Sequence, residues 1–289
     1  MSSMRDIKQR IENVSSVEQM IKAMDMVAST KLVKARAQLE GVRPIYNELK
    51  RIAEQVSIQE DAMSHIYYNQ QQVKNSLYIV LTSNKGLAGG YNINICKKAL
   101  EHMNRGKNEK LIVVGTKGYE YFRMHSKNIY HSIIDVSDEN VYYLTENLAR
   151  KALDLYLAAE VQEIYIAYTR FDNILTHVPI VEKVIPVQTN FNERPGFSDI
   201  KYEPSIEVFM DNLMPLYLHM YLFRTFSESH TSEQAARMVN MDAAGKNASD
   251  IIDNLSRIYN RKRQAAITQE LNEIVGSASV LNKGGSINE

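Results

Sequence analysis

The sequence predicts an α/β body with a mostly parallel sheet, inserted between two long helices that form an antiparallel coiled coil. Three observations lead to this fold class. From Leu216 to Asn282 the chain has no proline and only two glycines, Gly245 and Gly276. Apolar residues near the N-terminus recur with the period of a coiled coil. Between the two ends, short apolar runs alternate with amphipathic stretches.

The first predicted segment is a coiled-coil helix over residues 1–58. Its apolar residues follow an unbroken 4,3 spacing, which averages 3.5 residues and is typical of a left-handed coiled coil: Ala28, Leu32, Ala35, Leu39, Val42, Tyr46, Leu49, Ala53 and Val56. Toward the N-terminus, Ile21, Val14 and Ile7 continue one position of this seam, but the other position falls on Asp25 and Glu18. We therefore expect the seam to slip between residues 17 and 25.

The second predicted segment is the body, residues 75–190. Apolar or aromatic runs predict strands at residues 77–81, 111–114 and 164–168, and amphipathic stretches predict helices at 91–104, 117–125 and 139–159. This alternation is typical of βαβ units and predicts a Rossmann-like sheet. Residues 178–187 contain Pro179 and Pro186, which cannot donate to a ladder, so this run is expected to be an edge strand.

The third predicted segment, residues 205–286, is a helix with an unpaired tip. Read as one helix, residues 216–282 would extend about 100 Å. One predicted stripe carries Ala244, Ala248, Ile251, Leu255 and Ile258. The final stretch, residues 265–282, has small and apolar residues on nearly all sides, and a helix of this kind is expected to be enclosed. We expect a protein sleeve around it, and the alternative is a frayed, adhesive tail.

Composition excludes several classes of protein. Lys plus Arg and Asp plus Glu both number 34, and this zero formal charge argues against a nucleic-acid binder. Cys96 is the single cysteine, which excludes an intramolecular disulfide and a multi-cysteine zinc site, so we expect a half-buried structural thiol. No run of 18 apolar residues is present, and neither a membrane span nor a secretory signal is predicted.

Motifs for catalysis are weak. The loop Ser83–Asn92, SNKGLAGGYN, has glycines at 86, 89 and 90, which match neither common phosphate-binding spacing, so we expect a tight strand-to-helix turn. Ser198 lacks the second glycine of a nucleophile elbow. The seven histidines are scattered and do not form H-E-x-x-H. We predict no catalytic, cofactor-binding or metal-binding residue, and no cofactor.

Four sequence stretches carry a resemblance to a known family. They are IKAMDMVASTKL at residues 21–32, GLAGGYN at 86–92, YEPS at 202–205, and the run at 232–279 that contains RQAAITQE. With these stretches the chain resembles the gamma subunit of F-type ATP synthases along essentially its whole length. The C-terminal run is the most specific of the four.

The resemblance implies a non-catalytic subunit that acts as the central rotor stalk. In such a complex the helices stand in a ring of alpha and beta subunits, and the body binds the epsilon subunit and the membrane-embedded c-ring. Ion-driven rotation of the shaft takes the catalytic beta subunits through their states. The resemblance also implies a peripheral position on the cytoplasmic face of a bacterial cell membrane. It does not distinguish H⁺ from Na⁺ coupling, or ATP synthesis from hydrolysis.

The resemblance further implies six partner-contact residues. Met24 and Arg237 match positions that face a lower loop of beta. Four residues match positions that grip beta loops nearer the top: Arg263, Gln264, Thr268 and Glu270.

The matched heights of Met24 and Arg237 would also fix the helix register. Facing residue numbers would then sum to about 261, since antiparallel helices rise equally. Ile7 is therefore expected beside Asn254, and the helix is expected to be unpaired from Arg261 onward.

Two other functions stay open from the residues alone. A small nucleotide-dependent α/β enzyme would need a phosphate loop, and the glycine spacing does not supply it. A free-standing coiled-coil scaffold that homodimerises would need continuous heptads, which the expected slip at residues 17–25 would interrupt.

Overall fold

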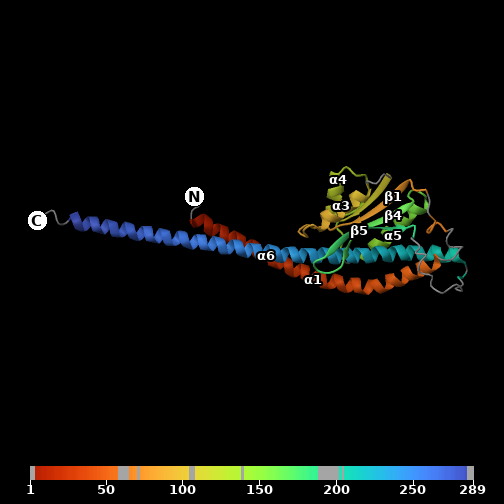
Figure 1. The fold of residues 1–289 in the computed structure, drawn as a ribbon, viewed down its shortest axis with the longest axis horizontal. Helices are drawn as coiled ribbons and strands as arrows, with labels where there is room; N and C mark the ends of the chain where they lie inside the picture. The colour runs from red at the N-terminus through yellow and green to blue at the C-terminus, as the bar shows by residue number, and fades with distance from the viewer. Residues whose placement is uncertain are drawn as a thin grey trace. The chain divides into compact units, whose positions relative to one another are not determined.

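The computed structural model describes residues 4–57, 65–69, 72–103, 108–137, 140–187, 202–203 and 205–284 of the 289-residue chain (Figure 1). It contains two compact units. Unit 1 combines Met1–Met26 with Met241–Glu289, and unit 2 is Val27–Asn240. Both long helices contribute to both units, so this division cuts across the predicted segments 1–58 and 205–286, while the predicted segment 75–190 lies within unit 2.

The two long helices are α1, Met4–Val56, and α6, Ile206–Gly284. With 79 residues, α6 extends about 120 Å at 1.5 Å per residue. In unit 1, Ile21 of α1 lies near Gly245 of α6. One turn earlier in α1, Glu18 accepts a hydrogen bond from Ser249, which lies one turn later in α6. The helices therefore run antiparallel, and the predicted fold class is confirmed.

The inward face of α1 follows one uninterrupted 4,3 spacing. The buried or half-buried positions that make up this seam are Ile7, Ile11, Val14, Glu18, Ile21, Asp25, Ala28, Leu32, Ala35, Leu39, Val42, Tyr46, Leu49, Ala53 and Val56. The predicted slip between residues 17 and 25 is wrong. Glu18 and Asp25 occupy the seam themselves, and Glu18 is accommodated because Ser249 and Lys22 hydrogen-bond or pair with its carboxylate.

The inward face of α6 in unit 1 is displaced from the predicted stripe. Its buried or half-buried residues again follow a 4,3 spacing: Met241, Gly245, Ala248, Ile252, Leu255, Tyr259, Lys262 and Ala266. Ile251 and Ile258, which were expected on this face, are 49% and 46% exposed. The prediction missed Gly245 and Lys262 because it searched for apolar side chains, and neither a glycine nor a lysine counts as supplying one.

The register of unit 1 also differs from the prediction. The numbers of the facing residues sum to 267 for Glu18 and Ser249 and to 266 for Ile21 and Gly245. The predicted sum of about 261 is therefore wrong by five or six residues. Since Lys262 and Ala266 are half-buried, the paired part of α6 extends beyond the predicted limit at Arg261.

The body in unit 2 is a five-stranded sheet with the strand order β3-β2-β1-β4-β5. The elements are β1 Asn75–Leu81, α3 Tyr91–Met103, β2 Asn108–Val114, α4 Thr116–Met124, β3 Ile129–Ile133, α5 Val141–Leu157, β4 Glu163–Phe171 and β5 His177–Ile185. Strands β1 to β4 pair in parallel, and β5 is antiparallel to β4. The mostly parallel sheet is confirmed, and the edge strand predicted over 178–187 is observed as β5 at His177–Ile185.

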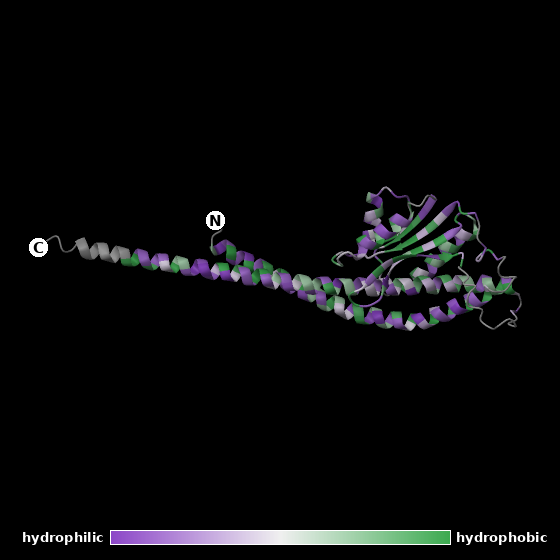
Figure 2. Cartoon of the chain, in the orientation of Figure 1, coloured by the Kyte–Doolittle hydropathy of each residue, from purple (hydrophilic) through white to green (hydrophobic). Residues whose placement is uncertain are grey.

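The two faces of the sheet are covered by different helices (Figure 1). Tyr78 and Val80 of β1 pack in one apolar cluster with residues of α3 and α4. Leu77, Ile79 and Leu81 alternate with them and pack in a second cluster with α5, α1 and α6. Figure 2 shows the hydrophobic character of the central strands, which are buried on both faces. The sheet is thereby joined directly to both long helices.

Strand β3 was not predicted. Its sequence, IYHSI, is half-exposed at the edge of the sheet and carries no continuous apolar run. The linker at residues 188–201, which includes Ser198, and the side chains of residues 276–284 at the predicted tip lie outside the described residues.

Candidate functional site

The glycine turn after β1 is closed by its own side chains. The Ser83 amide donates to Asn92 Oδ1 at 2.9 Å, and Asn92 Nδ2 donates to Ser83 Oγ at 2.7 Å. Gly89 has a φ of +56°, and a Cβ there would lie 2.5 Å from Asn240 Nδ2 on α6. The glycine at this position therefore permits the turn to contact α6, in keeping with the tight turn that the sequence predicts.

Arg237 fastens this turn to α6. Its guanidinium donates to the carbonyl oxygens of Lys85 and Gly86, both at 3.3 Å, and to Glu233 at 2.7 Å. Only 15% of the Arg237 side chain is exposed. A residue that the family resemblance assigns to a partner contact thus also has an internal role, which sequence reasoning missed.

Met24 lies on an exposed apolar face of α1 in unit 1. The exposed fractions are 50% for Val17, 57% for Met20 and 38% for Met24, and their 3,4 spacing puts them on one side of the helix. Next to Met24, Asp25 has a buried carboxylate oxygen that finds no hydrogen-bond partner within the described part of the chain. This face is apolar enough to contact another protein.

The tip of α6 carries the other four predicted contact residues. Arg263, Gln264, Thr268 and Glu270 are all exposed, and Thr268 Oγ1 donates to the Gln264 carbonyl oxygen at 2.9 Å. The two basic residues before Arg263 differ in exposure: Arg261 is exposed, whereas Lys262 is half-buried on the seam. Each of the four side chains is therefore accessible to a partner.

Four large apolar side chains at the tip are exposed as well. The exposed fractions are 48% for Ile267, 56% for Leu271, 64% for Ile274 and 67% for Val275. By helical spacing, Arg263, Ile267, Glu270 and Ile274 form one stripe, and Gln264, Thr268, Leu271 and Val275 form the stripe beside it. We call these eight residues the tip surface. The apolar half of the tip surface was predicted from the sequence, because residues 265–282 have small and apolar side chains on nearly all sides of the helix.

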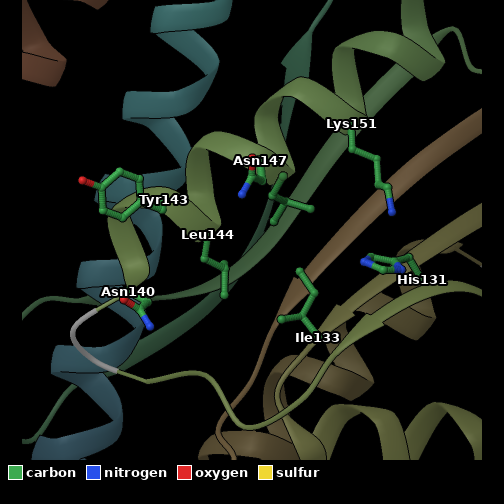
Figure 3. Close-up of a pocket in the computed structure, with 8 residues that line it drawn as sticks. His131, Ile133, Asn140, Tyr143, Leu144, Asn147 and Lys151 are labelled. Carbon is green, nitrogen blue, oxygen red and sulfur yellow. The ribbon is translucent and has the colours of Figure 1, made fainter.

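A cavity of about 390 Å³ lies between β3 and α5 (Figure 3). It is lined by His131, Ile133, Asn140, Tyr143, Leu144, Asn147, Leu148 and Lys151. Burial, and then the nearby Lys151 charge, lower the pKa of His131, so the imidazole is neutral at pH 7. These eight residues include no carboxylate or thiol.

Cys96 is fully buried on α3, rather than half-buried as predicted. Burial raises the pKa of its thiol to about 12, which leaves it protonated and unreactive at neutral pH. Across the described ranges, no cluster of three or more His, Cys, Asp or Glu side chains has the arrangement of a metal site. None of the described helices has a stretch apolar enough to cross a bilayer.

Comparisons with known proteins agree over nearly the full length. A family model described as ATP synthase matches residues 3–281. The ATP synthase gamma chain of Desulforamulus reducens is 37% identical over 283 residues, covering 97% of this chain and 100% of that protein.

Solved structures share the fold. A chain of the Euglena gracilis mitochondrial ATP synthase, from a structure of OSCP, F1 and c-ring, has a TM-score of 0.69 at 17% identity. The match covers 99% of this chain and 97% of that one. A chain of the Tetrahymena thermophila mitochondrial ATP synthase central stalk and c-ring has a TM-score of 0.63 at 22% identity, covering 78% and 99%.

Proposed function

The chain belongs to the ATP synthase gamma-chain family, and from this premise we propose that it is the central shaft of a rotary F-type ATP synthase. As a shaft it couples ion-driven rotation of a c-ring to the conformational cycle of catalytic beta subunits. The observation that carries the proposal is the tip surface, where large apolar side chains project beyond the paired part of α6. A surface of this kind favours enclosure by another protein.

The partners of the two helices are the alpha and beta subunits. Arg263, Gln264, Thr268 and Glu270 would grip beta loops around the tip, since charged and amide groups make directional bonds that change from one angular position to the next. Met24 would meet a lower beta loop through its exposed apolar face. Arg237 would meet the same loop through the small part of its side chain that stays accessible.

The partners of the body are the epsilon subunit and the c-ring. The likeness to a chain from a central stalk and c-ring structure supports this assignment. Bacterial relatives such as that of Desulforamulus reducens support a peripheral location on the cytoplasmic face of the cell membrane. The functional parts would then be residues 1–58 and 205–286 as the shaft and residues 75–190 as the body.

The two competing functions have less support. A homodimeric scaffold would need a free seam, whereas the α1 seam in unit 1 faces α6 of the same chain. A nucleotide-dependent enzyme would need open backbone amides in the glycine turn. There the Ser83 amide donates to Asn92 Oδ1, and the Tyr91 amide donates to the Ala88 carbonyl oxygen.

Affinity purification from native membranes tests the proposal. Tagged chain is expected to retain alpha and beta subunits. Replacing Ile267, Leu271, Ile274 and Val275 together by Ala should weaken that retention while preserving helix propensity. Met124→Ala with Leu157→Ala, at body positions that are 83% and 52% exposed, is the matched control and should retain both subunits. Recovery of the wild-type chain as a homodimer without alpha and beta would contradict the proposal.

A further inference from the structure

A single buried arginine links both long helices to the sheet in unit 2. Arg224 lies on α6, and only 12% of its side chain is exposed. Its guanidinium carbon lies 4.5 Å from the ring centre of Tyr46 on α1, 5.0 Å from that of Tyr221 on α6, and 5.5 Å from that of Tyr168 on β4. Three aromatic faces from three different elements therefore surround one cation.

Directional bonds add to these ring contacts. Arg224 Nη1 lies 2.7 Å from Glu228 Oε2, and Nη2 donates to the Tyr168 hydroxyl at 3.3 Å. Glu228 also accepts from Arg43 Nη2 of α1 at 2.9 Å. On the sheet side, the Tyr168 and Tyr221 hydroxyls both donate to Glu182 of β5. We call these seven residues the Arg224 cluster.

The charges in the cluster balance. Arg43 and Arg224 face Glu182 and Glu228, so the two buried charges, Arg224 and Glu228, are compensated, while Arg43 and Glu182 are 42% and 43% exposed. Burial is the main cause of the raised pKa of Tyr46, Tyr168 and Tyr221, and their phenols stay neutral hydrogen-bond donors. The three phenols therefore stay protonated across the neutral pH range.

The Arg224 cluster resists rotation of a helix about its own axis, a motion that apolar packing resists poorly. Apolar contacts are non-directional, so a helix turning about its axis exchanges one such contact for another. A side chain reaches about 5–6 Å from the helix axis, so a twist of about 10° moves its end by about 1 Å. That displacement lengthens the 2.9 Å bond between Arg43 of α1 and Glu228 of α6 beyond normal hydrogen-bond range.

We propose that Arg224 is a positioning residue that locks α1 and α6 rotationally to the sheet, so that torque passes between the helices and the body. This inference rests on the proposed shaft function. The fork of the guanidinium is essential, because it bonds Glu228 and Tyr168 at once while its central carbon lies over the tyrosine rings. A lysine would supply the charge but not the fork.

A variant pair separates this role from general stability. Arg224→Met with Glu228→Gln removes the charges together and leaves no lone buried ion. The control is Lys183→Met with Glu163→Gln. Lys183 is also paired with a buried glutamate and lies 5.5 Å from a tyrosine ring centre, but this pair joins β4 to β5 and involves neither long helix.

The measurement is torsional stiffness in the assembled complex. A probe attached to Met124→Cys in a Cys96→Ala background reports angular fluctuations of the body while the alpha and beta ring is held. Charge-assisted bonds are about twice as strong as neutral ones, so we expect stiffness to fall by about twofold in the Arg224→Met, Glu228→Gln variant. Arg224→Lys should be intermediate, and the control pair should match wild type.

Several results would overturn the inference. Unchanged stiffness in an assembled variant would do so, as would an equal loss in the control pair. Failure of both Arg224 variants to assemble would make Arg224 a folding residue instead. Failure of the wild-type chain to form a rotating complex would refute the shaft function itself, which is a different result.

Discussion

Ser249 of α6 donates a hydrogen bond to Glu18 of α1, with 2.6 Å between Oγ and Oε1. Lys22, one turn further along α1, pairs with the same carboxylate at 2.8 Å. The Lys22 bond, and then the Ser249 bond, hold the pKa of Glu18 below its usual range. A charged residue is thus held in the seam of unit 1, where polar seam residues serve to fix register.

The first prediction is a pH-dependent loss of stability in Ser249→Ala. A carboxyl group with a lowered folded-state pKa stabilises the fold above its ordinary pKa of about 4.3, and this contribution disappears as the pH falls through the folded value. We therefore expect a lower thermal midpoint at pH 7 and a shrinking difference from wild type below about pH 4, followed by circular dichroism. Ser16→Ala, which removes only a bond within α1, is the control. A difference that stays constant with pH would contradict the role of Glu18.

The second prediction concerns Gly245, which lies inside α6. A Cβ there would meet Ile21 Cγ2 at 3.7 Å, an ordinary contact distance. Gly245→Ala should therefore stabilise unit 1 by about 0.5–1 kcal/mol, since alanine restricts the unfolded chain and favours helix. Urea unfolding gives the measurement. Gly115→Ala is the opposite control: with a φ of +98° and a Cβ 2.3 Å from the Thr82 carbonyl oxygen, it should destabilise by at least about 1–2 kcal/mol.

The third prediction concerns Cys96. Its thiol pKa of about 12 leaves roughly one part in 10⁵ as thiolate at pH 7, so native protein should not react with a disulfide reagent until urea unfolds it. Cys96→Ala should preserve coupled ATP synthesis. Cys96→Ser places a hydroxyl among apolar neighbours and should cost about 1–3 kcal/mol of stability. Rapid labelling of the native chain would show that α3 opens.

The sequence predicted the body better than the seam. Strands β1, β2 and β4 are buried on both faces, and their apolar runs made them visible. Strand β3 was missed because an edge strand with Tyr130 and His131 needs no apolar run once β2 pairs with it. The edge position of β5 was predicted from Pro179 within the strand and Pro186 directly after it, since a proline cannot donate to a neighbouring strand.

The errors in the helices have a common cause. Glu18, Asp25 and Lys262 are charged, so a search for apolar periodicity placed them outside the seam, although each lies on it. Whether a charged residue fits there depends on its partner, and Ser249 lies far from Glu18 in the sequence. The internal bonds of Arg237 were hidden for the same reason, because the Lys85 and Gly86 carbonyl oxygens come from a distant turn.

The fourth prediction separates two kinds of contact in the tip surface. Arg263→Ala should lower coupled ATP synthesis more than assembly, because a charge-assisted bond contributes about 1.5–3 kcal/mol, which is small for an interface but changes a rate by tenfold or more. Ile267→Ala with Leu271→Ala should instead lower assembly, since it removes apolar contact area. Subunit retention and synthesis rates on the same preparations give the comparison. Equal losses of both in Arg263→Ala would make it a structural residue.

The fifth prediction tests the register of unit 1. The sums of 266 and 267 put Ile7 beside Tyr259, and the 4% exposure of Ile7 agrees with a partner at that height. Asn254, which the family-based register would place there, lies five residues away, or about 7–8 Å along the axis. A disulfide needs Cα atoms within about 7 Å. In a Cys96→Ala background, Ile7→Cys with Tyr259→Cys should therefore oxidise readily, while Ile7→Cys with Asn254→Cys should remain reduced. Both pairs can be scored by gel mobility in the isolated chain and in the complex. If only the 7–254 pair oxidised, the register with a sum of about 261 would be correct. The Glu18–Ser249 bond would then not determine the register.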